Sequence, residues 1–370
     1  MRHRLRPAGA DTTAMQCSQL VAGPTATARA SSNRRSPAIT AAIANRWGTS
    51  SQSARTVSKP PILVTRRIPS SVLRTLDEHV DVDLHDRGDL PHDQLLTRVA
   101  GKQGLLAVVT DSINRAVLEA GRDLKVVSTI AVGYNNIDIA AARERGIIVT
   151  NTPDILTEST ADLTWTLILG VMRRVVEGDR LVRRSQWKGF ALDFMLGSDL
   201  RGKQLGIIGF GRIGRAVAAR APAFGMRVAY TGRTVRPSSE GEAMPLDRLL
   251  STSDVVSLHC PLTPETTHLI NQATLMRMKR GAYLISAARG PIVDEAALVW
   301  ALENRLIAGA ALDVYEREPE LHPKLTTFEN VVLSPHLGSS AIETRTAMID
   351  LAARNVIAVL TGQPAITPIP

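Results

Sequence analysis

The sequence of 370 residues predicts an α/β protein built from two doubly wound parallel sheets, the second inserted into the first. From Pro60 onward, short apolar runs alternate with helical periodicity, which is typical of parallel sheets covered by helices. A glycine-rich turn at residues 209–214 divides the runs into two groups. A helical stretch at residues 340–360 follows the second group. It most simply packs back on the first, which makes the first domain discontinuous.

The first group has five apolar runs, enough for a small parallel sheet that ends near the turn at residues 151–153. These runs are residues 62–65, 80–84, 105–110, 125–132 and 147–150. A capping-box pattern at residues 159–162 then predicts a long helix that reaches about Arg184. Its wide apolar face favours a subunit interface over a purely internal core helix.

The second group starts with a strand that ends in glycines spaced G-x-G-x-x-G, Gly209, Gly211 and Gly214, and a helical pattern follows. In a dinucleotide site such glycines provide a tight turn, close backbone approach to pyrophosphate and close helix–strand packing. The helix start offers free N–H groups to the phosphates. A glycine-rich turn in another kind of α/β protein is the alternative.

Five more runs bring the second group to six strands, the count of a complete dinucleotide-binding sheet. With residues 205–209, they are residues 227–231, 254–259, 282–287, 308–314 and 330–334.

Composition restricts the possible classes. The apolar fraction of 44% is ordinary for a globular protein, and no apolar run approaches a membrane span. Cys17 and Cys260 are the only cysteines, too few for a disulfide framework or a cysteine-based zinc site. We therefore expect a cytoplasmic protein without a membrane partner or a metal.

The positive charge is concentrated at the N-terminus. Residues 1–59 contain nine basic residues and one acidic residue, so they carry +8 of the net +9 and the rest carries +1. Nucleic-acid binding by the core therefore has no electrostatic support. Residues 1–58, rich in Ala, Ser, Thr and Arg, predict a disordered extension. An organelle transit peptide and an over-long gene model are the alternatives.

Ligands of open α/β sheets bind outside the carboxyl ends of the strands. Only two of the eight histidines, His259 and His336, end apolar strands. Arg289 directly follows another such strand, between Ala288 and Gly290. The ordinary pKa of histidine suits proton transfer near neutral pH, which makes His336 a candidate proton donor. His259 is more simply a residue that lines a cofactor pocket or fills space.

Several ordered motifs carry a resemblance to a known family. They are AVGYNNID at residues 131–138, the glycine loop, PLTPET at 261–266, ARGPIVDE at 288–295, LDVYEREP at 312–319 and SPHLG at 334–338. Residues 60–360 resemble the D-isomer-specific 2-hydroxyacid dehydrogenases, in particular the glyoxylate/hydroxypyruvate and 2-ketogluconate reductases.

The resemblance implies a Rossmann cofactor domain inserted in a flavodoxin-like substrate domain. The expected parts are an extension (1–58), the first part of the substrate domain (59–155), the NAD(P)-binding domain (156–338), and the return helix and tail (339–370).

The family's catalytic residues would be Arg289, Glu318 and His336. A ketone reduced by hydride gains negative charge on oxygen, which His336 would protonate. Glu318, one of three acids in its loop, would stabilise the imidazolium, and Arg289 would hold a 2-oxo acid through two contacts. The substrate carboxylate would lie on backbone N–H groups around Val132 and Gly133.

The resemblance also implies a wider set of cofactor contacts. Asp313 would meet the nicotinamide carboxamide, with turn capping as its alternative role. The expected cofactor-binding residues are Gly209, Gly211, Arg212, Ile213, Gly214, Gly232, Arg233, Thr234, Cys260, Pro261, Thr266, Ala287, Ala288, Arg289, Asp313, His336 and Gly338.

Residues 232–234 predict cofactor choice. An acidic residue about 20 positions after the glycine loop binds the ribose 2′-OH in NAD enzymes, but Gly232 stands there. Repulsion of a 2′-phosphate is absent and Arg233 can bind one, so we expect NADPH, with NADH weaker.

The predicted function is reduction of glyoxylate, hydroxypyruvate or 2-ketogluconate by a homodimer. A corepressor-like dinucleotide sensor, or a relative acting on phosphite or 3-phosphoglycerate, are the alternatives. Phe190 stands where relatives often carry a tryptophan that reaches toward the substrate, sometimes across a dimer.

Overall fold

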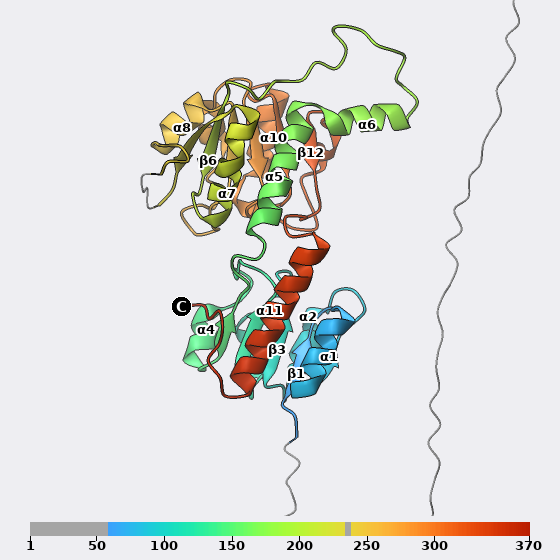
Figure 1. Cartoon of the computed structure of the whole chain (residues 1–370), viewed down its shortest axis with the longest axis vertical. Coiled ribbons are helices and arrows are strands. Elements are labelled where there is room, and N and C mark those ends of the chain that lie inside the picture. The colour runs from blue at the N-terminus through green and yellow to red at the C-terminus, as the bar shows by residue number, and fades with distance from the viewer. Residues whose placement is uncertain (1–57, 234–237) are drawn as a thin grey trace, which may run out of the picture. The chain divides into compact units, whose positions relative to one another are not determined.

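The computed structural model describes residues 58–233 and 238–370 (Figure 1). Its first sheet has five parallel strands in the order β2-β1-β3-β4-β5. They are β1 (Pro61–Val64), β2 (Asp81–Leu84), β3 (Gly104–Ala107), β4 (Val126–Thr129) and β5 (Ile148–Thr150). This order is flavodoxin-like. The five predicted strands are confirmed, and those predicted at 105–110 and 125–132 are considerably shorter.

Helices cover both faces of the first sheet. They are α1 (Ser70–His79), α2 (His92–Arg98), α3 (Arg115–Ala120), α4 (Ile139–Glu144) and α11 (Ile342–Leu360). As expected, α11 returns to this sheet (α11 is red and β1 blue in Figure 1), and Ala352 and Val356 share a core with Ile62 and Val64. The chain end after α11 also packs on the first domain, since the Thr367 hydroxyl donates a 2.6 Å hydrogen bond to the Asn151 carbonyl beyond β5.

The second sheet has seven parallel strands in the order β12-β11-β10-β9-β6-β7-β8. They are β6 (Gln204–Ile208), β7 (Arg227–Thr231), β8 (Glu242–Ala243), β9 (Val255–Leu258), β10 (Tyr283–Ser286), β11 (Gly309–Leu312) and β12 (Val331–Leu333). Strand order reverses at β6, between β7 and β9, as in a Rossmann fold. The six predicted strands are confirmed. β8 was missed because two residues show no periodicity.

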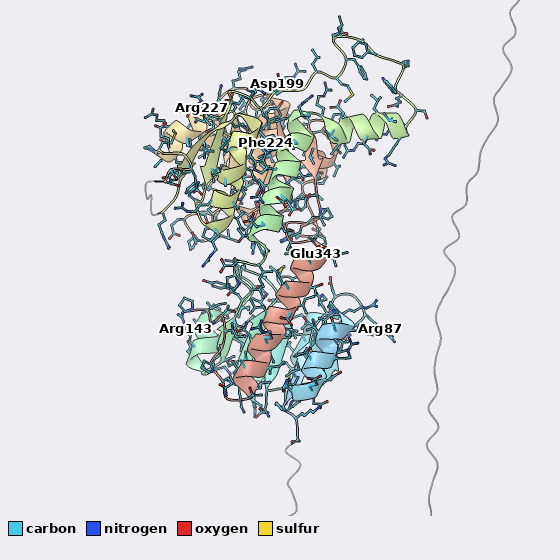
Figure 2. The ribbon with its side chains drawn as sticks, viewed as in Figure 1. Arg87, Arg143, Asp199, Phe224, Arg227 and Glu343 are labelled. Atoms are coloured by element: carbon cyan, nitrogen blue, oxygen red, sulfur yellow. The ribbon has the colours of Figure 1, made fainter. Side chains whose placement is uncertain are left out.

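The second sheet separates two apolar cores. Its helices are α5 (Thr157–Met172), α6 (Val175–Arg183), α7 (Arg212–Arg220), α8 (Leu246–Thr252), α9 (Gln272–Arg277) and α10 (Glu295–Glu303), with short 3₁₀ turns η1 (Ala221–Phe224), η2 (Gly290–Ile292) and η3 (Pro323–Thr327). One core lies between the sheet and α5 and α7, where Trp165 stacks on Phe224 with ring centroids 4.3 Å apart (Figure 2). The other lies under α8, α9 and α10.

The long helix predicted up to Arg184 is wrong in two respects. It breaks at Arg174, which has φ +52°, into α5 and α6. It also begins at Thr157 rather than at a Ser159 cap, since the Ser159 hydroxyl instead donates to the Gly338 carbonyl at 3.1 Å. Leu167 and Val171 of α5 are buried inside this chain, whereas Val175 and Val182 of α6 are exposed, and the interface on the predicted helix stays a prediction.

Within the described residues, no helix is both long and apolar enough to cross a membrane. The predicted extension lies outside the described residues except for Ser58. The four domain boundaries stay a prediction.

Candidate functional site

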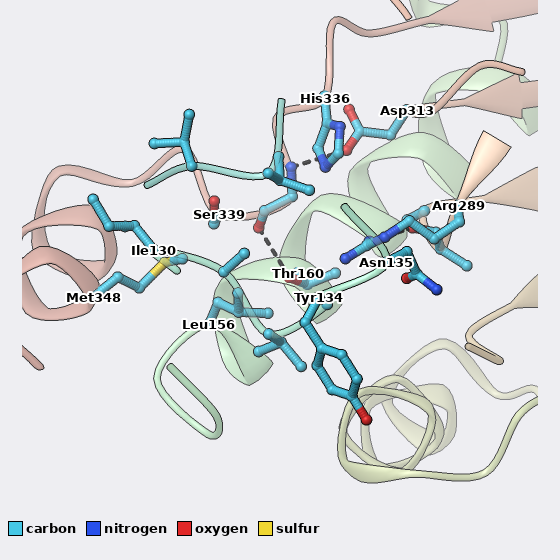
Figure 3. Close-up of a pocket in the computed structure, with 18 of the residues that line it drawn as sticks. Ile130, Tyr134, Asn135, Leu156, Thr160, Arg289, Asp313, His336, Ser339 and Met348 are labelled. Carbon is cyan, nitrogen blue, oxygen red and sulfur yellow. Dashed lines mark hydrogen bonds between the residues drawn. The ribbon is translucent and has the colours of Figure 1, made fainter. Parts of the chain in front are cut away.

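A cleft of about 1300 Å³ is lined by the loops at the carboxyl ends of strands from both sheets (Figure 3). The loop after β4 contributes Val132 and Gly133, and the second sheet contributes Arg289, Glu318 and His336. The structure therefore brings all three predicted catalytic residues and the predicted carboxylate-binding backbone into one cavity.

His336 and Glu318 form a close pair in this cleft. The Nδ1 atom of His336 lies 2.7 Å from Oε2 of Glu318, and the other carboxylate oxygen accepts a 3.1 Å hydrogen bond from the Tyr315 N–H. Since an ionised carboxylate can only accept, Nδ1 carries the proton in this contact. The Nε2 atom is then the ring nitrogen that can exchange a proton with a ligand.

The surroundings keep Glu318 ionised. Burial alone would raise the pKa of this carboxyl, but the hydrogen bond and charge of His336, the Tyr315 N–H and the charge of Arg289 outweigh burial. The pKa of Glu318 is consequently lower than usual. Glu318 is therefore a negative charge beside His336 at neutral pH.

Arg289 packs directly against Gly133. A Cβ atom added to Gly133 would overlap Nη2 of the guanidinium, so a larger residue there would have to displace Arg289. Nη1 of Arg289 donates to the Ala288 carbonyl at 2.7 Å. Burial lowers the pKa of Arg289 and Glu318 opposes that shift, but an arginine still stays charged. A cation and a backbone turn therefore meet in the cleft, as binding of a small carboxylic acid requires.

Asp313 holds the turn that carries His336. Its buried carboxylate accepts hydrogen bonds from the Ser334 hydroxyl and from the N–H groups of Leu337 and Gly338, at 2.5 to 2.9 Å. Burial raises its pKa, while these bonds and His336 oppose the shift. His336 itself has φ +54°. The alternative role of Asp313, turn capping, is therefore present in the structure, and Asp313 also lines the cleft.

The glycine loop after β6 fits a dinucleotide. Gly209 has φ +97°, and a Cβ there would overlap the Cys260 N–H group, while a Cβ at Gly214 would overlap the Gly209 carbonyl. Around Gly211, by contrast, a Cβ would meet no atom within 4 Å. Gly209 and Gly214 thus allow close packing, and Gly211 leaves the open space that a pyrophosphate needs.

The other predicted cofactor residues divide into three sets. Those lining the cleft are Gly211, Arg212, Ile213, Arg233, Cys260, Pro261, Ala287, Ala288 and Gly338. Gly209, Gly214, Gly232 and Thr266 are not part of its lining, and Thr266 instead shapes the 261–266 turn by donating a 2.7 Å hydrogen bond to the Pro261 carbonyl. Thr234 lies outside the described residues.

Two lining residues were missed by the sequence argument. Asp154, with φ +70°, forms an ion pair with Arg212 of the glycine loop. Asn135 was quoted only as part of a motif, and its side chain donates a 3.0 Å hydrogen bond to the Leu262 carbonyl, which links loops of the two sheets. No local pattern marks either contact, because each joins residues far apart in sequence.

His259 also lines the cleft, as one of its two predicted roles required. Its Nε2 atom lies 2.8 Å from the Ser257 hydroxyl, and burial lowers its pKa to about 4. Its Nδ1 atom is buried without a hydrogen-bond partner among the described residues. An unpartnered polar atom in the lining fits a site completed by a cofactor. Burial also raises the pKa of the neighbouring Cys260 thiol to about 11, which favours its neutral form.

Across residues 58–233 and 238–370, no group of three or more His, Cys, Asp or Glu side chains is arranged to hold a metal ion.

Known proteins match this chain over most of its length. Residues 165–338 match the model of the D-isomer specific 2-hydroxyacid dehydrogenase, NAD binding domain. A glyoxylate reductase of Thermococcus onnurineus is 45% identical over 314 residues, which cover 82% of this chain and 94% of the relative. The chain belongs to the D-isomer specific 2-hydroxyacid dehydrogenase family. It is therefore an NAD(P)-dependent oxidoreductase, as predicted.

Other relatives agree with this assignment. A glyoxylate reductase of Thermofilum pendens is 48% identical over 319 residues, covering 83% of this chain and 93% of the relative. A crystal structure of a protein from Thermus thermophilus has a TM-score of 0.81 and 47% identity over 84% of this chain and 100% of that one. A crystal structure of an NADPH-dependent glyoxylate/hydroxypyruvate reductase from Sinorhizobium meliloti, in complex with NADP and malonate, has a TM-score of 0.76 and 36% identity. The match covers 84% of this chain and 97% of that one. The predicted fold class and family resemblance are both confirmed.

Proposed function

We propose that this protein reduces a small 2-oxo acid to the D-2-hydroxy acid and prefers NADPH to NADH. The observation that carries the proposal is the meeting of Arg289, the Gly133 backbone and the His336–Glu318 pair in one cleft. The candidate substrates are glyoxylate, hydroxypyruvate and 2-ketogluconate. The names of the relatives support the first two, since they are called glyoxylate or glyoxylate/hydroxypyruvate reductases.

Each residue of the cleft has a defined task in this reaction. Arg289 binds the carboxylate and the carbonyl oxygen of the substrate, while the N–H groups around Val132 and Gly133 hold the carboxylate. Bound nicotinamide supplies the hydride. As the carbonyl oxygen gains negative charge, His336 donates a proton from Nε2, and Glu318 stabilises the imidazolium and fixes its tautomer.

Turnover with purified protein tests this proposal. We expect loss of nicotinamide absorbance when NADPH is mixed with glyoxylate, hydroxypyruvate or 2-ketogluconate, with one acid preferred. Tight dinucleotide binding without turnover on any 2-oxo acid contradicts the reductase and would favour the dinucleotide sensor.

NADPH preference rests on Arg233, which is exposed, lines the cleft and follows Gly232. We expect Arg233→Ala to raise the KM for NADPH about tenfold or more, because a charge-assisted contact with the 2′-phosphate is lost, and to change the KM for NADH less than about twofold. Arg227→Ala is the matched control, since Arg227 is exposed at the opposite end of β7 (Figure 2). Equal effects on the two cofactors would refute the assignment.

We also propose that the protein is a homodimer that associates through α6 and the loop after it, whose side chains project away from the remaining ribbon (Figure 2). Large apolar side chains are exposed along this segment: Val175, Val182, Trp187, Phe190, Leu192, Phe194 and Leu196. Phe190 and Leu192 are 85% and 87% exposed, and large apolar side chains exposed together along one segment support an interaction site there.

Light scattering tests the dimer. Phe190→Glu with Leu192→Glu should halve the mass relative to a dimeric wild type, whereas Met276→Glu, at an exposed residue outside this segment, should not. A wild-type monomer contradicts the proposal. We also propose that the protein is located in the cytoplasm.

A further inference from the structure

We propose that Glu295 is a positioning residue for this reaction, because its buried carboxylate fixes the loop that holds Glu318 against His336. This inference rests on the proposed function for its kinetic consequences. Its structural basis does not depend on the identity of the substrate.

Glu295 is unusual because its carboxyl group is buried. It is the first residue of α10 and only 5% exposed, and among the residues that the structure describes, the only other buried acids are Asp111 and Asp313. Within the same residues it forms no ion pair, although Asp111 pairs with Arg66. A buried carboxylate must obtain hydrogen bonds from elsewhere to be tolerated.

The hydrogen bonds come from the backbone of one loop. Oε1 of Glu295 accepts a 2.9 Å hydrogen bond from the Glu316 N–H, and Oε2 accepts a 2.6 Å hydrogen bond from the His322 N–H. Glu318 lies between these two anchor points. A single side chain therefore closes the loop on both sides of the residue that contacts His336.

The contact is reciprocal at one end. Oε2 of Glu316 accepts a 3.1 Å hydrogen bond from the Glu295 N–H, and Oε1 of Glu316 lies 2.6 Å from His268 Nε2. The N–H of Glu295 belongs to the first turn of α10, whose donors lack partners within the helix. The loop and the helix start thus satisfy one another.

The position of this loop determines where Glu318, and therefore His336, lies. Glu318 is two residues from Glu316, and its carboxylate bonds both the Tyr315 N–H and His336. Because two N–H groups face Glu295, only an acceptor with two free oxygens satisfies both. A glutamine would direct an NH₂ group at one of them, release one anchor and loosen the Glu318–His336 contact.

Glu295→Gln is the test variant. We expect kcat to fall about tenfold with KM changed less than about twofold, because the proton donor and not substrate binding is displaced. The acid limb of the kcat/KM profile should move to higher pH, as the pKa of Glu318 returns toward its ordinary value. Glu303→Gln is the matched control at the exposed end of α10, where Glu303 pairs with Lys324, and it should leave all three quantities unchanged.

A double-mutant cycle separates positioning from a general loss of structure. If Glu295 acts through Glu318, Glu295→Gln should have no further effect on kcat in a Glu318→Gln background. Multiplying effects, or an unchanged acid limb with a lower melting temperature, would overturn the proposal. If Glu295→Gln does not fold, Glu316→Gln is the substitute, because it breaks the reciprocal hydrogen bond from the loop side. The acid limb of its kcat/KM profile should also move to higher pH. An acid limb that stays in place would overturn the proposal.

A readout without substrate distinguishes this inference from the proposed function. Carbon NMR of the Glu318 carboxyl should give a higher pKa in Glu295→Gln than in wild type, whether or not any 2-oxo acid is turned over. An unchanged titration refutes the role of Glu295. An inactive wild type with a shifted titration refutes only the reductase.

Discussion

Two histidines line the same cleft from the ends of two strands of one sheet, yet their surroundings differ. His336 follows β12, is partly exposed and lies 2.7 Å from the carboxylate of Glu318. His259 follows β9, is largely buried and has a serine hydroxyl as its partner. A carboxylate stabilises a charged ring, whereas burial beside a neutral hydroxyl favours the neutral ring. Both histidines line the cleft, and under the proposed function the carboxylate partner makes His336 the proton donor.

Replacing each histidine in turn should produce the largest difference between the two. His336→Gln should lower kcat about 10³-fold because general acid catalysis is lost, whereas His259→Gln should lower it less than about tenfold. Steady-state kinetics with NADPH and the preferred 2-oxo acid measure both. Equal losses would mean that the two histidines do not divide the roles as their partners imply.

Removing the partner of His336 should have a smaller effect. Glu318→Gln keeps the shape but not the charge, so we expect kcat about 10²-fold lower. The pKa of Glu318 is lowered, so in wild type the ionised form persists until the pH falls below its ordinary value near 4.5. The acid limb of kcat/KM that arises from this carboxyl should vanish in the variant. Glu320→Gln, exposed in the same loop, is the control and should retain the limb.

The burial of His259 predicts a stability effect. Its pKa is lowered to about 4, so below pH 6.5 the unfolded chain binds a proton that the folded chain does not. Stability that is present at neutral pH is therefore lost as the pH falls from 6.5 toward 4. Between pH 7 and pH 5 this costs about 2 kcal/mol.

Urea unfolding at both pH values measures this cost. His259→Gln should lose about 2 kcal/mol less than wild type between pH 7 and pH 5. The exposed His79→Gln should behave like wild type. An equal pH dependence in wild type and His259→Gln would show that His259 is not neutralised by burial.

Local patterns in the sequence predicted most of the fold. Strand–helix alternation placed eleven of the twelve strands, and the glycine spacing located the turn after β6, since both signals are contained in a few neighbouring residues. The resemblance, not periodicity, selected Glu318 from its acidic loop. The cleft then brought Arg289, Glu318 and His336 together, although their roles stay predictions.

Contacts between distant residues explain what the sequence did not predict. α5 ends at Met172 because the N–H of Ser198 bonds the Met172 carbonyl at 2.8 Å, while Gly197 packs against it. Ser159 and Thr160 do not cap a helix because the Gly338 carbonyl takes both hydroxyls. Likewise Glu295 ends the motif at residues 288–295, but the motif does not reveal its contacts, and only the folded chain places it under the loop of Glu318.

The return of α11 to the first sheet sets an order for synthesis. All seven strands of the second sheet are contiguous between residues 204 and 333, so a nascent chain can complete that sheet before α11 leaves the ribosome. β1 to β5 emerge earlier with α1, whose Val72 and Leu76 join the core of Ile62 and Val64, but that core stays incomplete until Ala352 and Val356 arrive. The part translated first is therefore finished last. Throughout that interval it presents the kind of surface that chaperones bind and that aggregates grow from.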